Sequence, residues 1–213
     1  MNIFHPRSYA PSIHHVDYEA LRRRGIRALI FDLDNTLCLW RAGPPDARVR
    51  KLLKELIAQG FRVAVLSNGR LSLRPEVLAF FEEIGVPVIW PARKPLPRGF
   101  KRALWVLKVR PEETAIIGDQ LFTDVLGGNL AGLYTVLVTP LDPGRESPFT
   151  KLNRILERVL AGRKDPPAER SSPPQETPHA NVLAKPGEWV ELEHTDLPLQ
   201  LRVLTTDNIK FPS

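Results

Sequence analysis

Short apolar runs that alternate with helical segments constrain the fold of this chain more than any other feature. Five runs have the character of buried strands, at residues 27–31, 61–66, 86–90, 114–117 and 134–138. Apolar residues recur at helical spacing at residues 46–59, 74–84, 99–107, 123–131 and 150–160. Strands separated by single helices predict an α/β fold, a doubly wound parallel sheet with helices on both faces.

A proline-rich stretch divides the chain. Residues 163–180 contain five prolines and no periodic apolar pattern, which is typical of a linker. We therefore expect residues 1–162 to form the α/β domain. Residues 181–213 contain two strings of alternating polar and apolar residues and predict a small β-rich extension of unknown role. Because an isolated hairpin is marginally stable, this extension is expected to dock on the domain or on another chain.

Composition excludes several classes of protein. The single cysteine, Cys38, rules out a disulfide scaffold and a zinc site built on several thiolates. The chain has no apolar run of 18 residues and no apolar core near its N-terminus, so we expect neither a transmembrane segment nor a secretory signal. These features predict a cytoplasmic protein, with peripheral membrane association left open.

The positive charge belongs to the α/β domain. Residues 1–162 hold 24 Lys and Arg against 16 Asp and Glu, whereas residues 163–213 hold 6 against 8. A basic domain favours partners that carry phosphate, such as nucleotides, RNA or an anionic membrane surface. Solubility alone explains the same excess equally well.

Two carboxylates, Asp32 and Asp34, directly follow the first apolar run. Like charges this close repel each other, so the pattern calls for a bound cation or a shared proton. Mg²⁺ prefers carboxylate and carbonyl oxygens. In such a site Asp32 can attack phosphorus and Asp34 can transfer a proton. A solvated turn rich in Asp and Asn is the alternative for this pattern taken alone.

Polar residues also follow the next three apolar runs. Ser67 and Asn68 end the second run, Lys94 follows the third, and Asp119 ends the fourth, with Asp124 five residues further on. Each has an ordinary structural explanation, as a turn, a surface lysine or a helix cap. Ligands of doubly wound sheets bind beyond the carboxyl ends of the strands, where all of these residues fall. Together they predict a site for a phosphoryl group and a metal ion.

These residues resemble the four motifs of the haloacid dehalogenase superfamily of phosphohydrolases, in the same order along the chain. The resemblance implies that Asp32 forms an aspartyl-phosphate. It implies that Asp34 protonates the leaving group and then activates water. Ser67 and Lys94 would bind the phosphoryl group, and we include Thr36 and Asn68 among the residues that bind substrate.

The resemblance also implies a Mg²⁺ site. The ion would be held by the carboxylate of Asp32, the backbone carbonyl of Asp34 and the carboxylate of Asp119. Asp124 would assist through water or by orienting its neighbours.

The sequence strings at residues 31–37, 66–68, 92–95 and 118–129 look like the YqeG family, whose members belong to subfamily IIIA and lack a cap domain. The likeness covers roughly residues 3–160. The segments between the motifs are too short for a cap, so an open site is expected. Mitochondrial relatives of this family are similar to phosphatidylglycerophosphate phosphatases. The implied substrate is therefore that lipid or another large phosphorylated molecule.

Two other classes of protein compete with a phosphatase. A response-regulator receiver also places carboxylates, a hydroxyl and a lysine around Mg²⁺, but it needs a phosphoacceptor Asp after its third strand, where this chain has Arg93 and Lys94. The alternative function is a binding or assembly factor for RNA or a GTPase partner with vestigial phosphatase activity. In an open site, specificity depends on the rim, for which the candidates by position are Trp40, Arg41, Arg70, Arg74, Trp90 and Arg98.

Overall fold

A computed structural model of the chain describes residues 3–40 and 42–142. Its strands form one fully parallel sheet in the order β1-β6-β5-β2-β3-β4. Their bounds are β1 (Ser8–Ala10), β2 (Ala28–Phe31), β3 (Arg62–Leu66), β4 (Val88–Ile89), β5 (Thr114–Gly118) and β6 (Tyr134–Val138). The predicted α/β fold is confirmed. The helix expected at 150–160, the linker at 163–180 and the extension at 181–213 lie outside the described residues.

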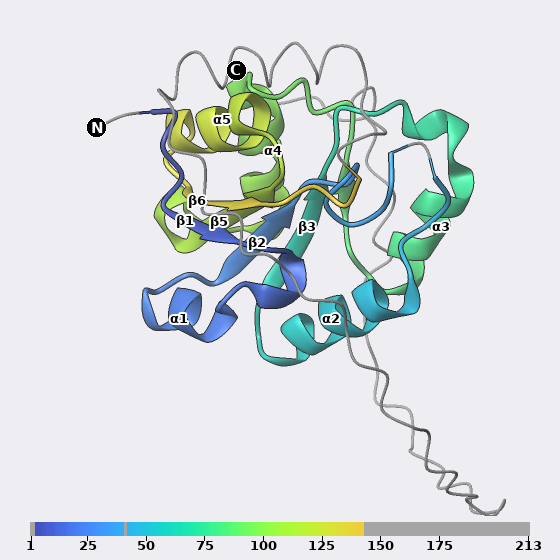
Figure 1. Ribbon diagram of the computed structural model, residues 1–213, viewed down its shortest axis with the longest axis horizontal. Helices are drawn as coiled ribbons and strands as arrows, with labels where there is room; N and C mark the ends of the chain where they lie inside the picture. The colour runs from blue at the N-terminus through green and yellow to red at the C-terminus, as the bar shows by residue number, and fades with distance from the viewer. Residues whose placement is uncertain (1–2, 41, 143–213) are drawn as a thin grey trace, which may run out of the picture.

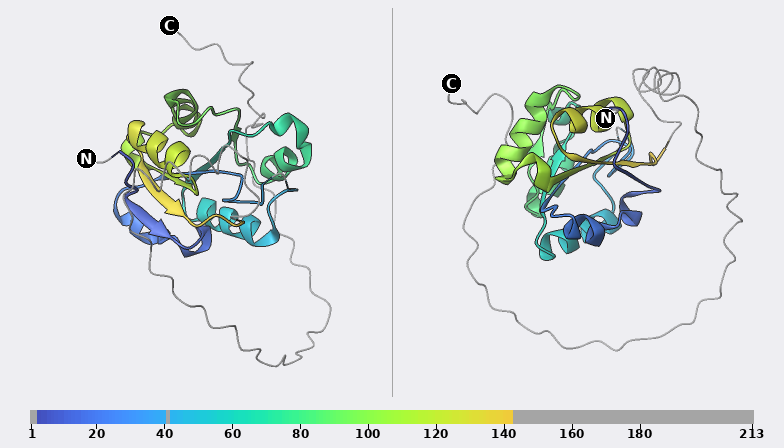
Figure 2. Two further views of the ribbon diagram at one scale, coloured as in Figure 1. Left: turned by 45° about the horizontal axis from the view of Figure 1, so that its top comes forward. Right: turned by 90° about the vertical axis from the view of Figure 1, so that its left-hand side faces the viewer.

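Helices cover both faces of the sheet. They are α1 (Tyr18–Arg23), α2 (Ala47–Ala58), α3 (Pro75–Glu83), α4 (Pro97–Leu107) and α5 (Leu126–Leu130). Figure 1 shows α1 and α2 below the sheet and α4 and α5 above it, and the second view of Figure 2 shows the same three layers. Among the described residues, no helix is both long and apolar enough to cross a membrane.

The central strand β2 shows why its sequence is apolar without alternation. Leu29 and Phe31 belong to the core between the sheet and helices α1, α2 and α3. Ala28 and Ile30 belong to the core between the sheet and α4. All four side chains are fully buried. Successive side chains of a strand point to opposite faces, so a parallel strand covered on both sides is apolar at every position.

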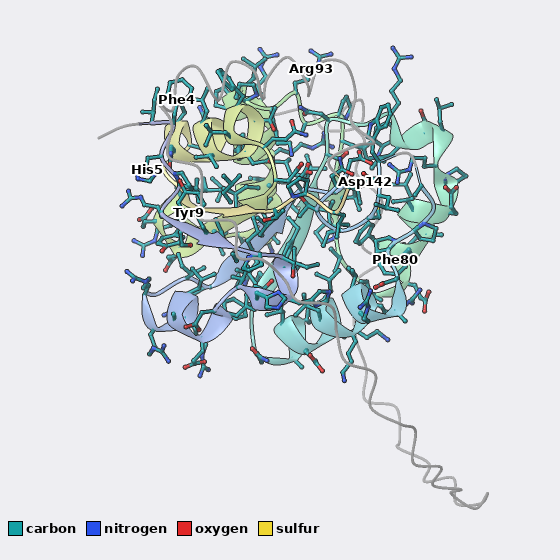
Figure 3. The ribbon with its side chains drawn as sticks, in the orientation of Figure 1. Phe4, His5, Tyr9, Phe80, Arg93 and Asp142 are labelled. Atoms are coloured by element: carbon teal, nitrogen blue, oxygen red, sulfur yellow. The ribbon has the colours of Figure 1, made fainter. Side chains whose placement is uncertain are left out.

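Two elements near the N-terminus were not expected from the sequence. The edge strand β1 pairs with β6, and the backbone N–H of Arg7 donates to the carbonyl of Thr135 at 2.9 Å. Figure 3 shows Phe4, His5 and Tyr9 along this edge. The three-residue strand has no apolar run to reveal it. The other element, α1, is too short to show helical periodicity, although the side chain of Asp17 caps it by accepting from the N–H of Ala20.

Three predicted boundaries were wrong. The strand expected at 86–90 is only Val88–Ile89, because Pro87 has no N–H to donate to a ladder. The helix expected from residue 99 begins at Pro97, since proline suits the first turn. In place of one helix over 123–131, a π-helical turn (Leu121–Val125) precedes α5.

Candidate active site

The carboxyl ends of four adjacent strands bring the predicted site residues together. The sheet pairing continues one residue past β2 and β3: the N–H of Asp32 donates to Ile117 at 2.9 Å, and that of Ser67 donates to Ile89 at 3.0 Å. Asp119 directly follows β5, and Lys94 lies in the loop after β4. The backbones that carry these side chains are therefore held by the sheet itself.

The two carboxylates of the turn after β2, Asp32 and Asp34, differ in burial. Asn35 has a left-handed backbone (φ 64°), and its N–H donates to the carbonyl of Cys38 at 2.7 Å. Leu33 and Leu37, which are fully buried, anchor this turn in the core. Asp32 is buried next to the sheet, whereas Asp34 lies nearer the surface, with its side chain 18% exposed.

Lys94 lies between two buried carboxylates. Its Nζ donates to Asp32 Oδ1 at 2.5 Å and to Asp124 Oδ1 at 2.7 Å, and none of the three side chains is more than 7% exposed. Burial disfavours the charge of the Lys94 amine, but attraction to Asp124 and Asp32 outweighs it and raises its pKa. The lysine therefore stays protonated.

Burial raises the pKa of Asp32 to about 7, with further upward contributions from Asp124 and Asp34, while Lys94 opposes the shift. A second cation near these carboxylates would favour their ionised form.

Three acidic side chains are placed so that they can hold a metal ion. Carboxylate oxygens of Asp32, Asp119 and Asp124 lie within 4.8 Å of one another, and all three residues are buried. The hydroxyl of Thr36 lies 3.4 Å from both Asp32 Oδ2 and Asp119 Oδ1. A cluster of oxygen ligands with excess negative charge suits a hard divalent cation.

Gly118, the last residue of β5, leaves the space that Asp124 occupies. A Cβ at this position would lie 2.3 Å from Asp124 Oδ2. The same oxygen accepts the N–H of Gln120, the residue just before the π-helical turn, at 3.1 Å. The sequence shows the glycine, but the need for it appears only when the turn folds back onto the strand.

We expect Gly118→Ala to lower activity strongly by displacing Asp124 from Lys94. Overpacking of a tight core typically costs about 1–3 kcal/mol, and a misplaced catalytic group can cost about 100-fold in rate. Steady-state hydrolysis of an aryl phosphate and thermal unfolding would measure both effects. Gly43→Ala is the matched control, because a Cβ at Gly43 meets nothing within 4 Å. Wild-type activity in Gly118→Ala would show that Asp124 need not occupy this position.

Ser67 and Asn68 have different surroundings. Ser67 is buried, and its Oγ accepts the N–H of Gly69 at 2.9 Å, which leaves the hydroxyl proton available to a ligand. The Asn68 side chain instead binds the backbone of Lys94, accepting its N–H at 2.8 Å and donating to its carbonyl at 3.1 Å. Asn68 thus fixes the loop that carries Lys94, so its side chain is already engaged with protein groups.

Arg74 lies deeper than its prediction as a rim residue implied. Its Nη1 donates to Asp34 Oδ1 at 2.6 Å, and its side chain is only 13% exposed. Of the other rim candidates, Arg70 and Arg98 are exposed, Trp40 and Trp90 are half-buried, and Arg41 lies outside the described residues. Arg93, which precedes Lys94, is exposed at the outer edge of the molecule in Figure 3.

The site is not covered by a second domain in the part of the chain that the structure describes. Between β3 and β4 there is only a 3-10 turn, η2 (Leu71–Leu73), followed by α3. The loop between β2 and α2 contains no helix or strand among its described residues. Within residues 3–40 and 42–142 the site is therefore open on the side of the strand carboxyl ends.

Comparisons with known proteins agree with this geometry. Residues 91–140, which include Lys94, Asp119 and Asp124, match the HAD-hydrolase-like family. The chain is 37% identical over 157 residues to the probable phosphatase YqeG of Bacillus subtilis, covering 74% of this chain and 89% of that protein. It is 32% identical over 192 residues to the chloroplastic phosphatidylglycerophosphate phosphatase 1 of Chlamydomonas reinhardtii, covering 85% of this chain and 71% of that one.

Among solved structures, the cobalt-bound deoxy-D-mannose-octulosonate 8-phosphate phosphatase YrbI of Haemophilus influenzae aligns with a TM-score of 0.44 at 17% identity. The alignment covers 65% of this chain and 88% of that one. The fold, the site and the sequence relatives define a phosphatase, and the chain belongs to the haloacid dehalogenase superfamily. Within that superfamily it resembles the YqeG phosphatases.

Proposed function

We propose that the protein is a Mg²⁺-dependent phosphomonoester hydrolase that acts through an aspartyl-phosphate on Asp32. The observation that carries this proposal is the Asp32 carboxylate, buried at the end of β2 and hydrogen-bonded to Lys94. Lys94 holds the carboxylate in one orientation and supplies positive charge where a phosphoryl group would arrive.

In the first half-reaction an oxygen of Asp32 attacks phosphorus, and the bond from phosphorus to the leaving oxygen breaks. Asp34 gives that oxygen its proton. Lys94 has three N–H donors, two of which are directed to Asp32 and Asp124, so one can bind a phosphoryl oxygen. The Ser67 hydroxyl can donate to another.

In the second half-reaction water attacks the phosphorus of the aspartyl-phosphate. The bond from phosphorus to Asp32 breaks, the carboxylate is restored, and Asp34 takes the proton from water. One residue thus serves first as acid and then as base, which suits its place at the more exposed end of the turn after β2.

The charges in the site support a divalent metal. Four carboxylates (Asp32, Asp34, Asp119 and Asp124) face two cations, Lys94 and Arg74. A further two positive charges would balance them. Asp32, Asp119 and Asp124 are the residues whose carboxylates would hold Mg²⁺ or its water ligands. When bound, the ion would offset negative charge on the transferring phosphoryl group.

Thorough chelation with EDTA is expected to abolish turnover, and added Mg²⁺ is expected to restore it. Without the ion, negative charge in the site opposes an anionic substrate. Phosphate release gives the rates, and calorimetric titration with Mg²⁺ gives binding without turnover. Full activity in a verified metal-free sample would contradict the metal assignment.

We further propose that the substrate is a phosphorylated lipid, with phosphatidylglycerophosphate as the leading candidate. Relatives named for that activity in Chlamydomonas reinhardtii and Arabidopsis thaliana support this choice. An open site admits a headgroup that stays attached to a membrane.

The loops around the site are apolar and cationic, which supports a lipid substrate. Four leucines in loops beyond strand carboxyl ends are 36–76% exposed: Leu39, Leu73, Leu96 and Leu141. Arg70 and Arg93 are exposed in the same loops, and Arg98 is exposed in the first turn of α4. Exposed leucines beside cations are typical of surfaces that bind anionic membranes.

Replacing both Leu73 and Leu96 by Ser should impair hydrolysis of the lipid but spare a soluble substrate. Loss of about 1 kcal/mol of insertion energy per leucine, roughly half of the value for full burial, would lower kcat/KM on vesicles at least about tenfold. p-Nitrophenyl phosphate should be hydrolysed at near the wild-type rate. Leu130→Ser is the matched control, because Leu130 is 58% exposed at the far end of α5. Equal losses on both substrates would argue against a membrane role for these leucines.

A further inference from the structure

Arg74 makes a set of contacts that the phosphatase chemistry described so far does not use. It lies between η2 and α3, and its guanidinium crosses to the turn after β2. Nη1 donates to Asp34 Oδ1 at 2.6 Å, and Nη2 donates to the carbonyl of Ala42 at 2.8 Å. Nη2 also lies 3.4 Å from Cys38 Sγ. Arg74 therefore bridges the Asp34 carboxylate and the loop after β2.

The two oxygens of Asp34 have different surroundings. Oδ1 accepts from Arg74, whereas Oδ2 lies beside Gly69. A Cβ on Gly69 would be 3.1 Å from Asp34 Oδ2 and 3.1 Å from Ser67 Oγ. Oδ2 and the Ser67 hydroxyl therefore border the same small space, which only glycine leaves open. The arginine holds one oxygen of Asp34 and leaves the other facing the side where Ser67 lies.

We propose that Arg74 is a positioning residue for proton transfer, which holds Asp34 Oδ1 so that Oδ2 faces the leaving group. This inference rests on the proposed role of Asp34 as acid and base. By also binding the carbonyl of Ala42, Arg74 ties the orientation of Asp34 to the loop at the open side of the site. No second domain covers this side among the described residues, and the Arg74 contacts link Asp34 directly to the loop there.

The contacts favour positioning over direct binding of substrate. Both terminal nitrogens are directed to protein acceptors, and the Nε is buried without a hydrogen-bond partner among the described residues. A planar guanidinium can span Asp34 and Ala42 at once, whereas a lysine ammonium is a single point on a flexible stem. The predicted consequence concerns the leaving group. An aryl leaving group departs from phosphorus with little need of an acid. An alkyl leaving group needs the proton from Asp34.

The test compares Arg74→Met with wild type on p-nitrophenyl phosphate and on glycerol phosphate. Release of the leaving group in a single turnover gives the rate of the first step, and steady-state kinetics give KM and kcat. A misdirected Asp34 should slow the alkyl ester about 10–100-fold, with the aryl ester and the KM values changed less than about threefold. Arg74→Lys should lie between Arg74→Met and wild type, and it carries the test if Arg74→Met does not fold. Arg50→Met is the matched control, since Arg50 pairs with Glu83 on α3 and not with a carboxylate of the site.

A double-mutant cycle identifies the partner. In an Asp34→Asn background, Arg74→Met should change the alkyl rate less than about twofold, because the group it positions is gone. Additive losses, equal losses on both esters, or a raised KM with unchanged kcat would each overturn the inference. If Asp34→Asn itself releases the alkyl group at the wild-type rate, the proposed role of Asp34 fails instead. If Asp34→Asn is slow and Arg74→Met is normal, only the role of Arg74 fails.

Discussion

Asp32→Asn is expected to abolish turnover while the fold stays intact. The amide has nearly the same size but lacks the charge that attacks phosphorus, so the rate should fall at least about a thousandfold on every substrate. Phosphate release from p-nitrophenyl phosphate measures the loss. Glu82→Gln, which removes an exposed carboxylate on α3, is the control for a change of charge alone. A variant that keeps a tenth of the wild-type rate would refute Asp32 as nucleophile. If the protein is instead a binding factor with vestigial phosphatase activity, Asp32→Asn would keep its biological role.

The same substitution should alter the pH dependence of stability in metal-free protein. Burial raises the pKa of Asp32 to about 7 in the folded state, above its ordinary value of 3.8. Between these two values the folded state binds more protons than the unfolded state, so this group makes the protein less stable as pH rises from about 4 to about 7. Thermal unfolding in EDTA should show this decline in wild type, and Asp32→Asn should lack that part of it.

Lys94→Met should reduce both stability and activity, because it removes the cation between two buried carboxylates. Breaking a buried pair from one side typically costs about 3–5 kcal/mol, which corresponds to a fall in Tm of roughly 10 °C for a chain of this size. Activity should fall at least about 100-fold, since the proposed phosphoryl site loses its buried positive charge.

Lys51→Met is the matched control for Lys94→Met. Lys51 lies on α2 with its side chain 78% exposed and pairs with Glu55 within the helix. Removing it should change stability by no more than about 0.5 kcal/mol. Thermal unfolding and turnover of both variants separate the buried lysine from a general loss of charge. An unchanged Tm in Lys94→Met would mean that Asp32 and Asp124 do not depend on Lys94 for compensation.

The sheet and the placement of the polar residues were predictable because both depend on local sequence. A strand buried on both faces is apolar throughout, so the runs that contain β2, β3 and β5 stand out, and the residue after each run must lie at the carboxyl edge. The prediction that Asp32, Ser67, Lys94 and Asp119 gather there depended on this geometry. It needed no knowledge of side-chain contacts.

The remaining features arise from contacts between distant segments. The edge strand β1 forms through pairing with β6, which lies more than a hundred residues further along the chain. The Asn68 side chain holds the backbone of Lys94, a contact that the sequence does not reveal, and the role of Asn68 in binding substrate stays a prediction. Arg74 was placed on the rim from its position after a strand, but its reach to Asp34 depends on how η2 packs against the turn after β2. Such pairings leave no periodic pattern in the sequence.

Chemical trapping of the covalent intermediate tests the central claim most directly. Asp34→Asn with an aryl phosphate should allow Asp32 to be phosphorylated while hydrolysis is slowed, so that the aspartyl-phosphate accumulates. Borohydride reduces an acyl phosphate, but not a free carboxylate, to a primary alcohol, and peptide mass spectrometry locates the reduced residue. We predict homoserine at position 32, dependent on both substrate and Mg²⁺. Reduction at another carboxylate, or none during measured release of the aryl group, would contradict the account.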